Sequence, residues 1–177
     1  MLLEGLRKER HTYELDAFCR DQYPRLVGFL SLYCGDADVA EELAQDALMR
    51  VVRDWPRVQK MDTPEAWLHR VALNLTNSFF RRRAAEARAK ERLASQPETY
   101  IQPATPEHLA VREAVAALPR RQKTALVLRY FGALFVRETA QVMDCPEGTV
   151  KTLTHKAIRA LRDLQQLEEL REVSDGT

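Results

Sequence analysis

Glycine and cysteine are scarce in this sequence, and long apolar runs are missing. Its 177 residues include 6 glycines and 3 cysteines. The glycines form no phosphate-binding loop, and Cys19, Cys34 and Cys145 lack the spacing of metal ligands. No segment approaches the roughly 20 apolar residues that span a membrane. We therefore expect reduced thiols, no metal, no cofactor and no membrane partner.

The N-terminus and the four histidines exclude further classes. The opening MLLEGLRKERH carries charges where a signal peptide needs an apolar stretch, so we expect a cytoplasmic protein. The histidines form no metal cluster, and no Ser or Cys lies in a nucleophile motif. The sequence therefore predicts a protein that is not an enzyme.

Charge is segregated along the chain although the net charge is only +1. Residues 36–46 hold five acidic residues and no basic one, whereas residues 81–92 hold six basic and two acidic residues, a net charge of +4. Such segregation indicates partners of both signs, with a polyanion at one place and a basic or mixed protein surface at another.

Apolar periodicity predicts an all-α fold with two small helical domains. The first domain, residues 12–93, contains helices over 15–33 and 38–53, the latter capped by Asp36, and a third that begins at Pro64 and continues into the Arg-rich stretch. Residues 94–106 contain three prolines and no apolar face, which indicates a flexible linker. The second domain, residues 107–170, contains four helices, ending with one over 149–164.

The end of the second domain has the pattern of a helix-turn-helix. The short helix ETAQVMD is followed by the turn CPEG and a longer basic helix. Val150 and Ala157 fall on the inner face of the last helix. Its outer face carries candidate DNA ligands, namely Lys151, Thr152, His155, Lys156 and Arg159.

These segments resemble a sigma factor of RNA polymerase, of the small two-domain extracytoplasmic-function (ECF) kind in the sigma-70 family. The segment that resembles region 4 of the family is LPRRQKTALVLRYFGALFVRETAQVMDCPEGTVKTLTHKAIRALRDL. The segment that resembles region 2.2 is DVAEELAQDALMRVVRDW, and the one that resembles regions 2.3 and 2.4 is PEAWLHRVALNLTNSFFRRR. The resemblance covers residues 12–165. It implies a protein that binds core polymerase, melts the −10 promoter element with region 2 and recognises the −35 element as duplex with region 4.

The resemblance also implies roles for individual residues. Contact with the β′ clamp helices of core polymerase is implied for Gln45, Asp46, Leu48 and Met49. The β flap is the second polymerase surface that the family binds. Binding of the −10 element is implied for Lys60, Met61, Asp62, Asn74 and Asn77, with Arg81, Arg82 and Arg83 as phosphate ligands. An anti-sigma factor, common in the family, stays open as a further partner.

The sequence departs from the family pattern at five places, four of them in the second domain. In the first domain, Asn77 or Ser78 stands where an aspartate is often seen. Leu153 stands where an arginine is common, and Thr154 and Thr139 stand where a leucine and an isoleucine are usual. Phe135 replaces the Ser or Thr that caps the first short helix. These departures imply a loosely packed second domain and an altered choice of upstream sequence.

Two other functions remain open. A conventional helix-turn-helix repressor or activator would bind operators without polymerase, although the chain has no sustained heptad seam for a dimer. A sigma-like mimic would bind a regulator rather than a promoter. Transcription that depends on added core polymerase separates both from a sigma factor.

Overall fold

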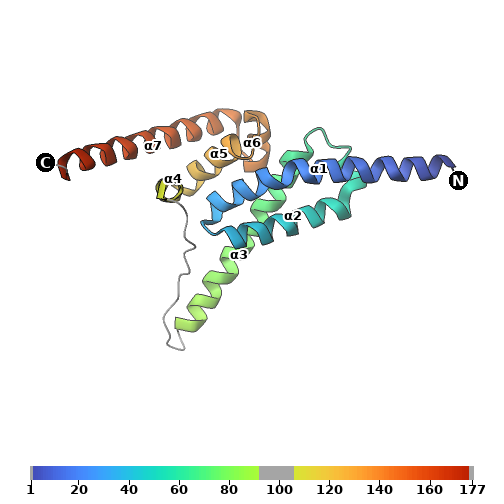
Figure 1. The fold of residues 1–177 in the computed structure, drawn as a ribbon, viewed down its shortest axis with the longest axis horizontal. Coiled ribbons are helices and arrows are strands. Elements are labelled where there is room, and N and C mark those ends of the chain that lie inside the picture. Colours follow the sequence, from blue (N-terminus) through green and yellow to red (C-terminus); the bar gives the residue numbers. More distant parts are fainter. Residues whose placement is uncertain (1, 92–105, 176–177) are drawn as a thin grey trace. The chain divides into compact units, whose positions relative to one another are not determined.

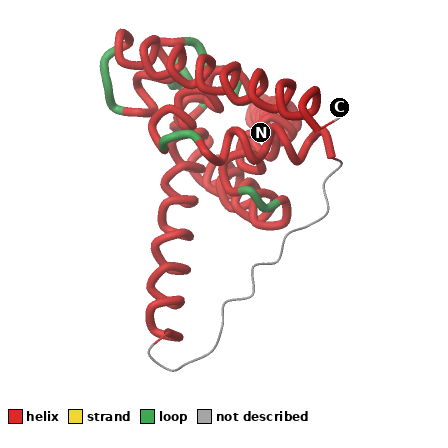
Figure 2. Tube along the Cα trace, turned by 90° about the vertical axis from the view of Figure 1, so that its left-hand side faces the viewer, coloured by secondary structure: helices red, strands yellow, loops and turns green. Residues whose placement is uncertain are grey.

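The computed structural model describes residues 2–91 and 106–175, and these residues form helices joined by short turns with no strand among them (Figure 2). Two compact units, Met1–Gln102 and Pro103–Thr177, divide the chain. The predicted all-α class is confirmed. The predicted linker, 94–106, lies outside the described residues except for Pro106, which begins a helix.

The first unit is a bundle of α1 (Leu2–Cys34), α2 (Ala37–Val58) and α3 (Pro64–Glu91). Helices α1 and α2 lie side by side, and α3 packs across them (Figure 1). The core contains Phe29 and Leu30 from α1, Val51 from α2 and Leu68 from α3, all fully buried. This packing is what the apolar periodicity predicts.

The turn between α1 and α2 follows the predicted signals. Gly35 has φ +78°, a left-handed conformation that glycine adopts without steric penalty. Asp36 then caps α2, because its carboxylate accepts a hydrogen bond from the Val39 backbone N–H at 3.1 Å. The predicted cap is therefore confirmed.

Three helices are longer than the sequence predicts. Helix α1 begins at Leu2 instead of residue 15, α2 continues through Pro56 to Val58 instead of ending near 53, and α7 spans Glu147–Asp175 instead of 149–164. In α2 the extension has a clear reason, because Trp55 and Val58 are buried in the core. Pro56 is exposed and lies in the last turn, where the absence of its N–H removes a single helical hydrogen bond.

Helix α3 begins at the predicted Pro64 and extends beyond the bundle (Figures 1 and 2). Every residue from Arg81 to Ala89 is exposed, so this part of the helix has no packed face. The first half of α3 is held by the core, whereas the second half projects into solvent.

The second unit contains α4 (Pro106–Ala117), α5 (Arg120–Tyr130), α6 (Val136–Met143) and α7 (Glu147–Asp175). Its core is formed by Val115, Leu128, Leu134, Val150 and Ala157. Helices α5 and α6 both pack against α7. The predicted helix-turn-helix is α6, a turn and α7.

The state of the cysteines, membrane-spanning helices and metal ligands can be examined over the described residues. Cys19, Cys34 and Cys145 are half-buried, as expected, and none of them is in a disulfide. Burial, and secondarily the carboxylate of Asp16, raises the pKa of Cys19, which keeps this thiol protonated. No helix in the described parts of the chain is long and apolar enough to cross a bilayer. Within those parts, no group of three or more His, Cys, Asp or Glu residues is arranged to hold a metal ion.

Candidate polymerase and nucleic-acid interfaces

The outer face of α2 combines acidic and apolar side chains. Met49 is 67% exposed and Val52 is 47% exposed, although the opposite face of the helix is fully buried. Of the predicted polymerase ligands, Gln45 and Asp46 are exposed and Leu48 is half-buried. Val52 was not predicted, yet it lies one turn from Met49 and enlarges the same apolar spot. Exposed apolar side chains within a charged rim are typical of protein-binding surfaces.

Charges at the end of this face are partly neutralised within the helix. Arg53 donates to both carboxylate oxygens of Asp54, at 3.1 and 3.0 Å, and these hydrogen bonds lower the pKa of Asp54. Earlier in α2, the exposed acids Glu41, Glu42 and Asp46 outnumber the exposed Arg50, so this surface has a net negative charge. This sign suits a basic or mixed partner helix.

The turn between α2 and α3 presents three of the residues predicted to bind the −10 element. Lys60 and Asp62 are exposed, and Met61 is half-buried. The turn follows directly from α2, because the Lys60 N–H donates to the Arg57 carbonyl at 3.2 Å and the Met61 N–H to the Val58 carbonyl at 3.0 Å. The three side chains are thus carried by a short hydrogen-bonded turn.

The remaining predicted −10 ligands lie along α3. Asn74 is exposed and Asn77 is half-buried, and Arg81 follows four residues after Asn77 and donates to the Ser78 hydroxyl at 3.1 Å. At 1.5 Å per residue, Arg81 is about 26 Å along the helix from Pro64. Consecutive helical residues are about 100° apart, so Arg81 continues the asparagine face whereas Arg82 and Arg83 point around the sides of the projecting helix. The three arginines are therefore distributed around the helix and do not share one face.

Helix α7 presents the five predicted duplex ligands to solvent. Each of them is exposed, namely Lys151, Thr152, His155, Lys156 and Arg159. Val150 and Ala157 are fully buried on the opposite side and fix the helix against α5 and α6. The Thr152 hydroxyl donates to the Gly148 carbonyl at 2.9 Å, which leaves its lone pairs for a donor on the ligand.

The departures from the family pattern have local consequences in α6 and α7. Phe135 is the N-cap of α6 without a side-chain acceptor, and only the Glu138 carboxylate compensates, by accepting from the Phe135 N–H at 2.6 Å. The hydroxyl oxygens of Thr139 and Thr154 are buried and have no hydrogen-bond partner among the described residues. Such groups lower stability, because they lose water without gaining a substitute.

The corner between α5 and α6 carries aromatic side chains whose exposure the sequence did not predict. Phe135 is 74% exposed, and Tyr130 and Phe131 are also exposed. Arg129, beside them, donates to the Leu134 carbonyl and closes the corner. Ala133, within the corner, has φ +52°, a left-handed conformation that disfavours any side chain. The corner thus presents an apolar surface of its own.

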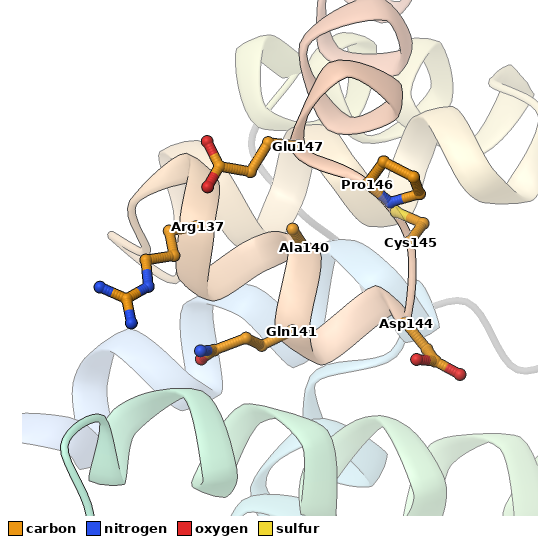
Figure 3. A pocket seen from close by; sticks show the side chains of 7 residues that line it. All are labelled: Arg137, Ala140, Gln141, Asp144, Cys145, Pro146 and Glu147. Carbon is orange, nitrogen blue, oxygen red and sulfur yellow. The ribbon is translucent and has the colours of Figure 1, made fainter.

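A shallow open hollow of about 530 Å³ lies beside the turn that joins α6 and α7 (Figure 3). Asp144 ends α6 in the left-handed conformation, and the Cys145 N–H donates to the Ala140 carbonyl at 3.1 Å, which makes the turn tight. The charged side chains at its edge, Arg137, Asp144 and Glu147, give a net charge of −1. The hollow is therefore a poor phosphate site, and the basic face of α7 is the better one.

Comparison with known proteins identifies two sigma-factor regions in this chain. The profile of Sigma-70 region 2 matches residues 19–86, and that of Sigma-70 region 4 matches residues 108–161. The RNA polymerase sigma-E factor of Streptomyces coelicolor is 28% identical over 84% of each chain. The ECF RNA polymerase sigma factor EcfG of Rhodopseudomonas palustris is 30% identical over 76% of this chain and 75% of its own.

The fold also matches that of a solved sigma factor. The sigma factor RpoE of Bartonella quintana, solved in complex with the anti-sigma factor NepR, superposes with a TM-score of 0.75 at 22% identity, over 86% of this chain and 97% of its own. Both sigma regions are thus present in the family's order, and relatives match them across most of their length. The chain belongs to the extracytoplasmic-function subfamily of the sigma-70 family of RNA polymerase sigma factors.

Proposed function

We propose that the first unit of this sigma factor holds core RNA polymerase and the opened −10 strand, while the second holds the −35 element as duplex. Promoter-specific initiation with core polymerase and promoter DNA as partners is the function of the family. Two surfaces of different chemistry, one on each unit, support this division of roles. The first unit has an acidic face with an apolar spot, and the second has a basic recognition helix.

On the first unit, we assign the β′ clamp helices to the outer face of α2. Met49 and Val52 would supply the apolar contact, and Gln45, Asp46 and the half-buried Leu48 would surround it. Apolar side chains at the centre of an interface contribute most of its affinity, whereas charged neighbours mainly speed encounter. The turn 60–62 and the track from Asn74 to Arg81 would bind the displaced strand.

On the second unit, we assign duplex DNA to α7 and the β flap to the aromatic corner. Lys151, Lys156 and Arg159 supply charge for phosphates, and His155 and Thr152 supply shorter donors and acceptors for base edges. The corner of Tyr130, Phe131 and Phe135 offers the apolar area that a polymerase element needs. The bounds 12–93 and 107–170, with a linker over 94–106, remain our proposal for the functional domains.

We assign no catalysed reaction to this chain, because the polymerase forms the phosphodiester bonds. We also propose that the protein acts in the cytoplasm, where bacterial core polymerase works. An anti-sigma partner is a further proposal, supported by the solved relative RpoE, which was captured with the anti-sigma factor NepR.

Reconstituted transcription tests the proposal directly. Purified protein added to core polymerase and genomic DNA fragments is expected to yield transcripts from a small set of promoters that core enzyme alone does not select. Met49→Asp would place a charge in the apolar spot and is expected to weaken core binding by more than about thirtyfold, as for an interface hot spot. Tyr13→Asp is the matched control, because Tyr13 is an exposed large side chain of α1, outside the α2 surface.

The same assay separates the alternatives. A conventional repressor would bind duplex DNA without polymerase and would not direct initiation. A sigma-like mimic would leave the choice of start sites equal to that of core enzyme alone. Either result would contradict the proposal.

The recognition helix supplies a second prediction. Lys151→Ala or Lys156→Ala is expected to reduce initiation at −35-dependent promoters about tenfold by removing a phosphate contact. Core affinity, measured by fluorescence anisotropy of labelled protein, should stay unchanged. Arg121→Ala, at an exposed arginine of α5, is the charge-matched control. Loss of core affinity in the lysine variants, with DNA use intact, would show that the roles of α2 and α7 are misassigned.

A further inference from the structure

The turn between α2 and α3 is bridged by a side-chain contact that the proposed function does not use. Arg57 lies in the last turn of α2, and Trp67 lies in the first turn of α3. The guanidinium carbon of Arg57 is 5.7 Å from the centroid of the Trp67 ring. A cation at this distance over an indole face is attracted by the ring quadrupole. The contact therefore joins the two helix ends between which residues 59–63 are held.

Backbone hydrogen bonds hold the α2 side of this turn more firmly than the α3 side. On the α2 side, the Gln59 N–H donates to the Trp55 carbonyl at 3.0 Å, and two further hydrogen bonds from the next residues follow. On the α3 side, the Trp67 N–H donates to the Thr63 carbonyl at 3.3 Å. Val58 and Leu68 hold the inner side, where both are fully buried. The Arg57–Trp67 stack is the corresponding attachment on the outer side.

Three roles for Arg57 are compatible with its exposed position. It could bind a phosphate of the opened strand, it could leave Trp67 so that a base stacks on the ring, or it could hold the turn. The charge needed for the first role is already supplied by Lys60 in the turn. The second role requires an exposed ring, but Trp67 is half-buried and Arg57 occupies a face of it.

We propose that Arg57 is a positioning residue, which stacks on Trp67 and so holds the turn 59–63 in the conformation that receives an extruded base of the −10 strand. The inference rests on the proposed function of that turn. A turn that is already ordered loses less conformational freedom when it captures a base, and this saving appears as affinity. Placement of a binding group by a supporting contact is a general requirement of precise sites.

Binding of a labelled single-stranded −10 oligonucleotide to holoenzyme tests the inference. Arg57→Ala and Arg57→Met are both expected to weaken binding about two- to fivefold, the factor that an exposed cation–π contact provides. Arg57→Lys keeps a cation over the ring and is expected to restore most of the affinity. Trp67→Phe, which weakens the quadrupole but keeps an aromatic face, should lose part of the affinity that Arg57→Ala loses, and the double variant should be no worse than Arg57→Ala alone.

Two readouts separate positioning from the other roles. The salt dependence of oligonucleotide binding should be unchanged in Arg57→Ala, whereas loss of a phosphate contact on a single strand would lower the slope by about 0.7. Acrylamide quenching of free protein should increase in Arg57→Ala, because Trp67 loses its cover while Trp55 stays buried. A lowered salt slope, or tighter binding once the ring is uncovered, would overturn the inference.

Failure of the inference is distinguishable from failure of the proposed function. Lys60→Ala and Asp62→Ala alter the turn itself and leave the stack in place. If these two variants weaken oligonucleotide binding and Arg57→Ala does not, the turn binds the strand but needs no positioning residue. If none of the three changes binding, the −10 site lies elsewhere, and both the inference and this part of the proposed function are wrong.

Discussion

Replacement of Arg81, Arg82 and Arg83 by alanine is expected to lower the affinity of holoenzyme for promoter DNA by roughly a hundredfold at physiological salt, for all promoter sequences alike. The three guanidinium groups lie where α3 leaves the bundle and every residue is exposed. Phosphate contacts release condensed counterions, and this release carries no sequence information. The loss should therefore be uniform, and core affinity should not change.

The salt dependence of binding reports how many of the three arginines act. Each lost phosphate contact lowers the slope of log K against log salt by about 0.9 on duplex and by about 0.7 on a single strand. We expect a fall of roughly 2 to 2.7 for the triple variant, because a helix without a packed face can present side chains to DNA around most of its circumference. A fall of only about 0.7 to 0.9 would mean that Arg81 alone, which continues the asparagine face, makes contact.

The matched control is Arg88→Ala, on the same projecting part of α3. Arg88 is exposed, and its Nε donates to the Ala84 carbonyl at 3.1 Å. Its removal changes the net charge by one, as each of the other substitutions does, but leaves the three arginines in place. Arg88 lies seven residues after Arg81 on the same face, so equal losses in Arg88→Ala and Arg81→Ala would show that phosphate contact is not confined to residues 81–83.

The sequence was sufficient to predict the helices whose start signals are local. Asp36 accepts from the first turn of α2, and Pro64 has no N–H to satisfy at the first position of α3, so both starts are visible in a few letters. The buried sides of α2 and α7 were likewise predictable from three- and four-residue spacing. The placement of the duplex ligands on the outer face of α7 followed from the same periodicity.

Features that depend on tertiary contact were not predictable. Pro56 suggested that α2 ends early, but burial of Trp55 and Val58 holds its last turn. Val52 is apolar in sequence, and only the packed structure shows that it faces solvent beside Met49. The stack of Arg57 on Trp67 joins residues ten apart, across a turn whose path the sequence does not specify.

A second large effect is expected from two conservative changes in the second unit. Thr139→Val together with Thr154→Val replaces two buried hydroxyls, which lack partners among the described residues, by methyl groups of similar size. An unsatisfied buried polar group lowers stability by about 1–3 kcal/mol, so we expect a combined gain of roughly 2 kcal/mol or more. For a unit of about this size, 2 kcal/mol raises Tm by roughly 10 °C.

The measurement uses the full chain, because its two tryptophans report one unit only. Trp55 and Trp67 both lie in the first unit, so tryptophan fluorescence should be unaffected while the helical signal of the second unit melts later. Thr124→Val is the matched control, since the Thr124 hydroxyl is mostly buried and donates to the Arg120 carbonyl at 2.8 Å. Its loss should be neutral or destabilising. A gain of the same size there would mean that the added methyl groups stabilise by packing, independently of any hydroxyl.

Transcription by the stabilised double variant then tests why these hydroxyls are retained. Thr139 lies in α6 and Thr154 in α7, so both affect the contact that orients the recognition helix. If the hydroxyls only lower stability, the variant should initiate at the same promoters with the same strength, because polymerase binding already holds the folded unit by mass action. If instead the loose packing lets α7 adjust to different upstream elements, a tighter unit should narrow the set of promoters used, and this narrowing should persist at temperatures far below the melting transition.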